Sequence, residues 1–391
     1  MNFDILNNDV QQFIADNLKV DITKLILKGS PFDSVLIQDL AHQVVSKDKC
    51  EKKLPSWFAT EKIYYPPKIN IEQTSSEVTA KYKSEIIKRD SIIDITGGFG
   101  VDCYYFSKKI KQVIHCEINE DLSKIVSHNY QKLKVNNIDT FTGNGFDYLK
   151  STKQTFDCIY IDPSRRNDIK GKVFLLKDCL PYIPPKINFY FSRAKYILVK
   201  VSPILDISNT INDLQNVKEV HIVAVNNEVK ELLFLLEKDF ESNILIKTIN
   251  FKKSITEKFN FLLKEEVISN YSEPLSYLYE PNAAILKSGG FHQVTNKLNV
   301  LKLHQHSHLY TSDTLINFPG RKFKVEAILP YDKKQIKKLI PSKKANFTTR
   351  NFPKNVAQLR KETKIKEGGS IYVFFTKNIK NELTVLICKK T

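Results

Sequence analysis

The stretch DITGGFGVD, residues 94–102, places three glycines between an apolar run and the start of a helical pattern. The apolar run SIIDI, residues 91–95, predicts a strand, and residues 101–110 predict a helix. Glycine adopts backbone angles that other residues avoid, so the three glycines predict a sharp turn that a ligand can approach closely. Open α/β sheets bind ligands at turns of this kind, at the carboxyl ends of their strands.

Strands and helices alternate after this turn. Further strands are predicted over 112–117, 138–144, 156–162, 196–203 and 217–225. Asn226-Asn227 suits a tight turn, which favours a hairpin into a seventh strand and leaves a helix over 228–238 as the alternative. The sequence therefore predicts an α/β fold with a Rossmann-like sheet of seven strands, mostly parallel, and an antiparallel hairpin at its end.

The 391 residues suit more than one domain. A helical part is expected over 1–72, the sheet domain over 73–271, a small domain over 272–319 and a basic α+β domain over 320–391. Thr74 and Glu77 stand three apart, which predicts a capping box at the start of a helix. The last domain is predicted as strand 321–329, helix 332–340, strand 345–350, helix 354–365, and strands 368–375 and 382–388.

Positive charge is concentrated in the last segment. The chain carries a formal charge of +17, and residues 321–391 hold 19 Lys plus Arg against 5 Asp plus Glu. The first 320 residues are therefore nearly balanced, which a general lysine bias does not explain. A basic segment of this kind is typical of proteins that bind nucleic acid, and a well-solvated basic face is the alternative.

Two cofactor patterns compete at the glycine turn. A dinucleotide fingerprint aligns on Gly98 and Gly100 but lacks its third glycine, which is Cys103. S-adenosyl-L-methionine sites instead use an acidic residue, a spacer and alternating glycines, which Asp94, Gly98 and Gly100 supply. Nine residues are candidates for that cofactor: Asp94, Thr96, Gly97, Gly98, Gly100, Asp102, Glu117, Asn144 and Asp162.

The next two strands end on side chains that suit an adenosine. Glu117 ends the second predicted strand, where a carboxylate can accept two hydrogen bonds from a ribose diol. Asn144 ends the third, beside the expected adenine. Thr96 stands where the pattern has its first glycine, and Gly97 is an extra one.

The fourth strand ends in Asp162-Pro163, within YIDPSRRN, residues 160–167. A carboxylate there can orient an acceptor for methyl transfer, which depends mainly on positioning because the sulfonium donor is already activated. Arg165 and Arg166 can grip a phosphate or stack on a base, or they can pair with helix carboxylates and shape the loop. Lys200, in the fifth strand, is placed to reach the same cleft. No cysteine follows Pro163, which argues against a covalent cysteine mechanism.

Other features indicate a protein of the reducing cytoplasm without a metal. The six cysteines show no CxxC pair or regular spacing. His304, His306 and His308 alternate along one segment, which more often makes a polar strand face than a metal site. No apolar run is long enough for a membrane helix, and residues 1–12 do not resemble a secretion signal.

The sequence resembles a family of class I methyltransferases that carry a C-terminal THUMP-like domain. The similarity rests on KLPSW (53–57), EQTSSEVTAKYK (72–83), DITGGFGVD, IYIDPSRR (159–166), YEPNAAILKSGG (279–290), HLYTSD (308–313) and TTRNFPKNVAQLRK (348–361). The resemblance implies an S-adenosylmethionine fold in the centre, a small ferredoxin-like insert near 275–318 and an RNA-binding-like tail.

The sequence therefore predicts an S-adenosylmethionine-dependent methyltransferase of RNA, with a nitrogen of a tRNA or rRNA base as the expected acceptor. Asp162, Pro163, Arg165 and Arg166 are the expected catalytic group. Two alternatives stay open. One is a non-catalytic RNA-binding or ribosome-assembly factor, and the other is a methyltransferase of a protein or small molecule.

Overall fold

The structure is a computed structural model that describes residues 1–165 and 175–391. The chain divides into two compact units. The N-terminal unit comprises Met1–Lys218 and Leu233–Glu241, and the C-terminal unit comprises Glu219–Leu232 and Ser242–Thr391. The four domains expected from the sequence have different limits and stay a prediction.

The N-terminal unit begins with short helices around their own core. These are η1 (Phe3–Leu6), α1 (Asn8–Asp16), α2 (Ile22–Lys28), α3 (Ile37–Lys53), α4 (Pro55–Ala59) and α5 (Lys68–Gln73). The spacing of Leu36, Leu40 and Val44 predicts one buried helical stripe, and Leu40 and Val44 of α3 are indeed buried against α1 and α2. Leu36 is exposed, because it is the N-cap that precedes the helix. α3 ends at Lys53. Pro55 is the first residue of α4, and the first position of a helix is the one where proline is best tolerated.

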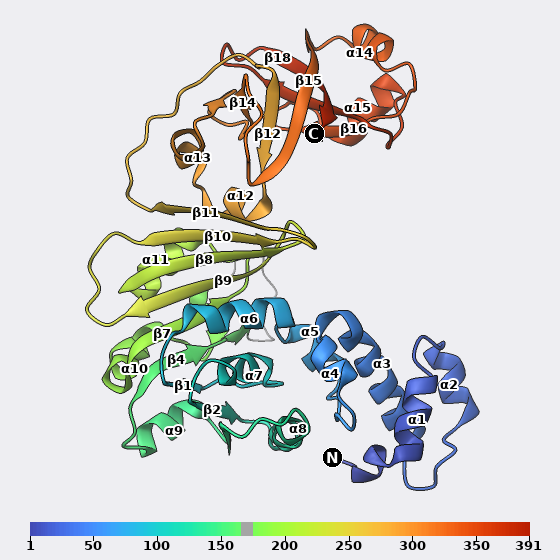
Figure 1. Ribbon diagram of the computed structural model, residues 1–391, viewed down its shortest axis with the longest axis vertical. Coiled ribbons are helices and arrows are strands. Elements are labelled where there is room, and N and C mark those ends of the chain that lie inside the picture. The colour runs from blue at the N-terminus through green and yellow to red at the C-terminus, as the bar shows by residue number, and fades with distance from the viewer. Residues whose placement is uncertain (166–174) are drawn as a thin grey trace. The chain divides into compact units, whose positions relative to one another are not determined.

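In the described residues the large sheet has nine strands, two more than predicted (Figure 1). They are β1 (Ser91–Asp94), β2 (Gln112–Glu117), β3 (Ile138–Thr142), β4 (Phe156–Ile161), β7 (Ala194–Val201), β8 (Val217–Val225), β9 (Glu228–Glu237), β10 (Leu245–Phe251) and β11 (Thr256–Leu262). Their order is β11-β10-β8-β9-β7-β4-β1-β2-β3. β1 lies between β2 and β4 and is parallel to both, so the glycine turn leaves the middle of the parallel part.

The predicted hairpin is present, but it is not at the end of the sheet. Asn226 and Asn227 both have positive φ, 50° and 66°, which a two-residue turn between β8 and β9 requires. β10 then pairs with β8 in parallel, and β11 pairs with β10 in antiparallel fashion. Residues of β11 alternate between exposed and buried, a pattern of period two that the sequence prediction left unassigned.

Helices follow the strands of the N-terminal unit as expected for βαβ connections. They are α6 (Glu77–Ile86), α7 (Val101–Ser107), α8 (Glu120–Lys132), α9 (Gly145–Ser151), α10 (Ile187–Arg193) and α11 (Ile207–Leu214). The capping box predicted from Thr74 is wrong: Ser76 is the cap of α6 and accepts from the amide of Thr79. The carboxylate of Glu77 accepts instead from Ser56 and Tyr105.

The C-terminal unit contains a second sheet with the order β13-β14-β12-β15-β18-β17-β16. Its elements are β12 (Tyr277–Pro281), α12 (Ala283–Ser288), α13 (Phe291–Leu298), β13 (Leu301–Lys302), β14 (Tyr310–Ser312), β15 (Gly320–Pro330), α14 (Lys333–Leu339), β16 (Asn346–Thr349), α15 (Val356–Thr363), β17 (Ile371–Lys377) and β18 (Leu383–Lys390). The six elements predicted from residue 321 onward are all present. β12 pairs with β15, so the two small C-terminal segments share one sheet.

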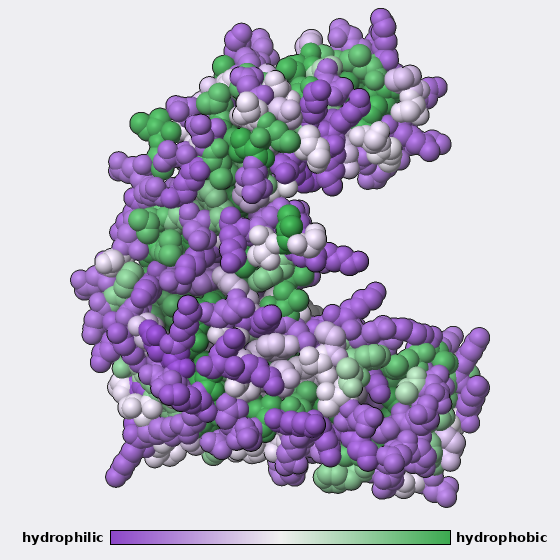
Figure 2. Space-filling view, viewed as in Figure 1, coloured by the Kyte–Doolittle hydropathy of each residue, from purple (hydrophilic) through white to green (hydrophobic). Residues whose placement is uncertain are grey.

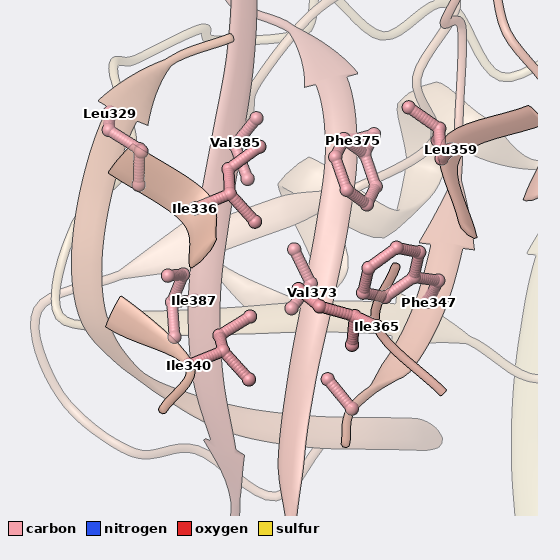
Figure 3. Close-up of a cluster of buried hydrophobic side chains, with 11 residues drawn as sticks. Leu329, Ile336, Ile340, Phe347, Leu359, Ile365, Val373, Phe375, Val385 and Ile387 are labelled. Carbon is pink, nitrogen blue, oxygen red and sulfur yellow. The ribbon is translucent and has the colours of Figure 1, made fainter. Parts of the chain in front are cut away.

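α14 and α15 bury a hydrophobic cluster against this sheet (Figure 3). Ile336 and Ile340 lie one helical turn apart, and Phe347, Val373 and Phe375 come from neighbouring strands. Apart from the exposed Leu339, the remaining side chains of α14 are polar, and hydrophilic side chains cover most of the surface visible in Figure 2. Among the described residues, no helix has both the length and the apolar composition of a membrane span.

Candidate functional site

Thr96 fastens the glycine turn to the end of β4. Its hydroxyl donates to Asp94 Oδ1 at 3.0 Å and accepts from the backbone amide of Asp162 at 2.8 Å. Asp94 Oδ1 also accepts from the amide of Thr96 at 2.9 Å. A glycine at position 96 would lack this hydroxyl. The departure from the glycine pattern therefore has a structural reason: Thr96 sets the position of Asp162 relative to the turn.

Asp94 is buried behind the turn. Burial raises the pKa of its carboxyl to about 7, although the hydrogen bond from the Thr96 amide acts in the opposite direction. Cys103 Sγ lies 3.4 Å from the second carboxyl oxygen. Asp94 thus shapes the turn from inside, as a buried acceptor for backbone and side-chain donors.

The glycines of the turn have different reasons to be glycines. A Cβ on Gly97 would lie 2.3 Å from His115 Nε2, and one on Gly100 would lie 2.2 Å from Tyr130 Oη. Gly97 and Gly100 are therefore both packed against other side chains of the protein. Gly98 has a φ of +56°, and a Cβ there would meet only Thr96 O, at 3.8 Å, within 4 Å. The face of Gly98 is open, and a ligand can approach its backbone closely.

Glu117 points at this turn from the end of β2. Its Oε2 accepts from the amide of Gly98 at 2.8 Å, and its Oε1 accepts from the amide of Asn119 at 2.7 Å. Each carboxylate oxygen can accept a further hydrogen bond. The arrangement fits a vicinal diol, which would donate one hydrogen bond to each oxygen.

Asn144 follows β3 on the same edge of the sheet. Gly143 donates from its amide to Glu117 O at 2.8 Å, which joins the ends of β2 and β3. A Cβ on Gly145 would lie 2.5 Å from Ile95 Cα, so the residue after Asn144 packs against the exit of β1. Asn144 Oδ1 caps α9 by accepting from Phe146 N at 2.9 Å. The structure thus brings Gly98, Glu117 and Asn144 together, as the sequence predicts.

Asp102 faces away from this cluster, into a buried ion pair. Lys83 Nζ lies 3.2 Å from Asp102 Oδ1, and the Lys83 side chain is fully buried. Asp102 Oδ2 accepts from Ser75 Oγ and Tyr160 Oη, each at 2.9 Å. These contacts join α6, α7 and β4. They give Asp102 a structural position that the cofactor pattern did not suggest.

Asp162 is half-buried at the end of β4 and forms an ion pair with Lys200 of β7. β4 and β7 are parallel neighbours, with Ile161 opposite Val199, so both side chains emerge at the carboxyl edge. Pro163 is buried. The backbone of Arg165 lies in β5 (Ser164–Arg165), which pairs with β6 (Cys179–Leu180). Arg166 and the side chain of Arg165 lie outside the part of the chain that the structure describes, and their roles stay predictions.

A second lysine, at the end of α3, lies near this pair. Lys53 Nζ donates to the carbonyls of Ile71 at 2.8 Å and Glu72 at 2.7 Å. Burial, followed by the positive charge of Lys200, lowers the pKa of Lys53 to about 8. Sequence patterns did not indicate Lys53, although it begins the unusual string KLPSW.

Two of the three alternating histidines contact each other, because the backbone amide of His306 donates to Nδ1 of His304 at 3.1 Å. His304 Nε2 is hydrogen-bonded to Asn381 Oδ1 at 2.9 Å, and the ring of His308 stacks on Phe291 with centroids 3.6 Å apart. Among the residues described, no three His, Cys, Asp or Glu side chains form a group that could hold a metal ion. The six cysteines are all buried, and none of them forms a disulfide.

The order of the strands and the position of the glycine turn define a class I methyltransferase fold. Across nearly its whole length the chain is similar to a protein of Porphyromonas gingivalis W83 whose crystal structure is described as a "putative methyltransferase". The two share 30% identity and superpose with a TM-score of 0.89, over 99% of this chain and 98% of that chain. The chain belongs to this family, the class I methyltransferases that carry a C-terminal THUMP-like domain.

Family models match the C-terminal unit in two adjacent parts. A ferredoxin-like domain matches residues 277–319, and a THUMP-domain-like model matches residues 320–390. No curated protein matches the chain.

More distant solved structures cover less than half of the chain. A putative methyltransferase of Streptococcus mutans in complex with SAH is 14% identical over 41% of this chain and 96% of that chain, with a TM-score of 0.31. TrmK of M. capricolum in complex with SAH is 14% identical over 45% of this chain and 70% of that chain, with a TM-score of 0.33. Similarity at this level carries no argument about ligands or substrates.

Proposed function

We propose that the protein is an S-adenosylmethionine-dependent methyltransferase that acts on RNA. One observation carries the cofactor: the Glu117 carboxylate meets the Gly98 amide beside an open glycine face, at the carboxyl edge of a parallel sheet. Glu117 would hold the ribose hydroxyls, and Asn144 would lie beside the adenine. Gly98 would let the cofactor approach the backbone, while Gly97 and Gly100 would keep the turn packed.

The other candidate residues act around that position. Asp94 and Thr96 would hold the turn, and Thr96 would fix the amide of Asp162 within reach of the acceptor. The bound cofactor supplies an activated methyl group on sulfur, so the chain's own contribution is to position and align the acceptor. We assign Asp102 to the fold and not to the cofactor, because Lys83, Ser75 and Tyr160 occupy it.

RNA as the acceptor is supported by the C-terminal unit. Residues 321–391 carry most of the formal charge, and a THUMP-domain-like model matches residues 320–390. α14 and the following turn contain lysines and no acidic residue, and Lys337, Lys338 and Lys343 are exposed there. Binding through phosphate contacts would weaken steeply with salt. A cytoplasmic location, with reduced cysteines, remains our expectation.

Calorimetry and methyl transfer test this proposal together. We expect S-adenosylhomocysteine to bind the purified protein at one site with micromolar affinity, and a labelled methyl group to appear in RNA at low salt. Binding without transfer to any RNA, protein or small-molecule fraction would favour a non-catalytic RNA-binding factor. Absence of binding would reject the cofactor site altogether.

A further inference from the structure

The carboxylate that follows β4 does not stand alone. A lysine from the neighbouring strand contacts one of its oxygens: Lys200 Nζ donates a hydrogen bond to Asp162 Oδ2. The Lys200 side chain is 14% exposed and that of Asp162 is 33% exposed, so the pair is partly accessible at the carboxyl edge of the sheet. Thr96 holds the backbone of Asp162 from the other side, at 2.8 Å.

This contact changes what Asp162 can do for an acceptor. An orienting carboxylate for an amino group works best when its negative charge is uncompensated, because the nitrogen becomes positive as the methyl group is transferred. An ammonium ion beside the same carboxylate would repel that developing charge. An oxygen acceptor has the opposite requirement, since the oxygen must lose its proton and carries negative charge as it attacks.

The surroundings of the pair add to the positive potential. Lys53 lies close enough to Lys200 for the charge of Lys200 to affect its protonation. Its ammonium is anchored by two backbone carbonyls at the end of α5, so it cannot swing far from this position. Two lysines therefore lie near the one carboxylate that would face the acceptor. Such a group stabilises an oxyanion and disfavours a cationic nitrogen.

We propose that the acceptor is a hydroxyl oxygen of RNA, the ribose 2′-hydroxyl, with Lys200 as the residue that positions Asp162 and supplies positive charge beside the oxygen. This rests on the function proposed above and replaces the base nitrogen expected from the sequence. Within an RNA strand the 2′-hydroxyl is the hydroxyl that each nucleotide presents, and it can both donate and accept hydrogen bonds.

The transfer balances as a single displacement. Asp162 accepts the hydrogen bond of the 2′-hydroxyl through Oδ1, the oxygen that does not contact Lys200. The hydroxyl oxygen forms a bond to the methyl carbon while the carbon–sulfur bond breaks, and the electron pair of that bond remains on sulfur. The hydroxyl proton passes to the Asp162 carboxylate and then to solvent, and the products are a methyl ether and a neutral thioether.

The position of the methyl group can be read from the stability of the product in alkali. Alkali cleaves RNA through the free 2′-hydroxyl, so a 2′-O-methylated nucleotide stays joined to its 3′ neighbour in an alkali-resistant dinucleotide. We would incubate the full chain with methyl-labelled S-adenosylmethionine and with total RNA from cells that lack the gene, and then digest the RNA with alkali. We expect the label in alkali-resistant dinucleotides.

The other results are distinguishable. Label released as mononucleotides with methylated bases would overturn the hydroxyl acceptor but leave the RNA methyltransferase in place. Failure to label any RNA, with S-adenosylhomocysteine still bound, would overturn the proposed RNA function together with this inference.

Variants of Lys200 test the positioning role. We expect Lys200→Met to lower kcat by about 100-fold or more, as for the loss of one oxyanion-stabilising donor, with little change in KM for RNA. Affinity for S-adenosylhomocysteine should stay unchanged, and Lys200→Arg, which keeps the charge, should retain more activity than Lys200→Met. Lys218, whose Nζ lies 2.6 Å from Glu237 Oε2, provides the matched control, and Lys218→Met should keep full activity. An unchanged kcat in Lys200→Met would contradict the inference.

Discussion

Among the Asp–Lys ion pairs of the N-terminal unit, two with little-exposed lysines differ in what surrounds them. Lys83 and Asp102 are buried together, with the lysine side chain fully enclosed and that of the aspartate 10% exposed. Lys200 and Asp162 lie at the carboxyl edge of the sheet, where the aspartate side chain is 33% exposed. The same two residue types thus occur once inside the fold and once at its proposed reactive edge.

The hydrogen bonds of the two carboxylates explain the difference. Both oxygens of Asp102 are enclosed by protein groups: Oδ1 lies 3.2 Å from Lys83 Nζ as an ion pair without a hydrogen bond, and Oδ2 accepts from Ser75 and Tyr160. Among the described residues, only Oδ2 of Asp162 has a side-chain partner, Lys200. An enclosed carboxylate stabilises a local structure, and a partly exposed one keeps an acceptor oxygen that a substrate can reach. The role of an aspartate near a glycine turn therefore follows from the groups that contact it and not from its position in the motif.

The largest expected effect is on activity, at Asp162. We expect Asp162→Ala to lower kcat/KM for RNA by roughly 10²–10⁴-fold, because the acceptor loses its orienting and proton-accepting group. The free energy of unfolding should change by less than about 1 kcal/mol, since the carboxylate is partly exposed. Steady-state kinetics and urea unfolding of the same preparation measure both. A large loss of stability would show that this pair is structural after all.

The opposite result is expected at Asp102. Asp102→Ala removes the carboxylate that forms an ion pair with the buried Lys83 ammonium, and breaking a buried pair typically costs about 3–5 kcal/mol of stability. The double variant Asp102→Leu with Lys83→Met removes both charges and should be more stable than Asp102→Ala alone. Lys111→Ala is the control, because its pair with Asp90 is highly exposed and should contribute less than about 1 kcal/mol. Equal unfolding midpoints for Asp102→Ala and the wild type would contradict the buried-pair interpretation.

A buried base under the turn should make stability depend on pH. Burial lowers the pKa of His115 to about 4 from its ordinary 6.5, so the native state keeps the ring neutral where the unfolded chain protonates it. The contribution of His115 to stability should therefore be fully present above pH 6.5 and fall by up to roughly 1.4 kcal/mol per pH unit between 6.5 and 4. Asp94, whose pKa burial raises to about 7, contributes a slope of the opposite sign over the same range. Urea unfolding across this range would measure the slope. His115→Leu should remove the His115 part of the slope and leave that of Asp94, and a slope identical to that of the wild type would rule out His115 as a contributor.

The smallest effect concerns the cofactor. Glu117→Ala removes two charged acceptors from the proposed ribose position, so affinity for S-adenosylhomocysteine should fall by about 10–100-fold. Glu120→Ala, three residues further on, removes an exposed carboxylate that pairs with Lys124 and should leave the affinity unchanged. Calorimetry would compare the affinities of the two variants for S-adenosylhomocysteine, and equal affinities would show that Glu117 does not contact the ligand.

The sequence indicated the parts of this edge that lie close to the glycine turn along the chain or at strand ends. Gly98, Glu117 and Asn144 follow strands whose apolar patterns are clear, and parallel strands bring their carboxyl ends to one edge. Thr96 was noted only as a departure from the pattern, since its partner Asp162 lies 66 residues away. The pairing of Asp102 with Lys83 also needs a tertiary contact that no local spacing reveals.

The sequence prediction also missed the continuation of the sheet. β10 and β11 extend it beyond the β8–β9 hairpin, although the sequence suggested that the hairpin ends it. Glu257 of β11 helps to explain why these strands are ordered. Its Oε2 accepts from Asn250 and Asn282, each at 2.9 Å, within the C-terminal unit. Asn282 belongs to the string YEPNAAILKSGG. The contact with Glu257 gives this part of the string a structural role that the sequence alone did not reveal.

A crystal structure with bound S-adenosylhomocysteine tests the central claim most directly. We predict both ribose hydroxyls within about 3 Å of the two Glu117 carboxylate oxygens, with the sulfur directed toward Asp162. A ligand seated elsewhere, with Glu117 still held only by Gly98 and Asn119, would contradict the account.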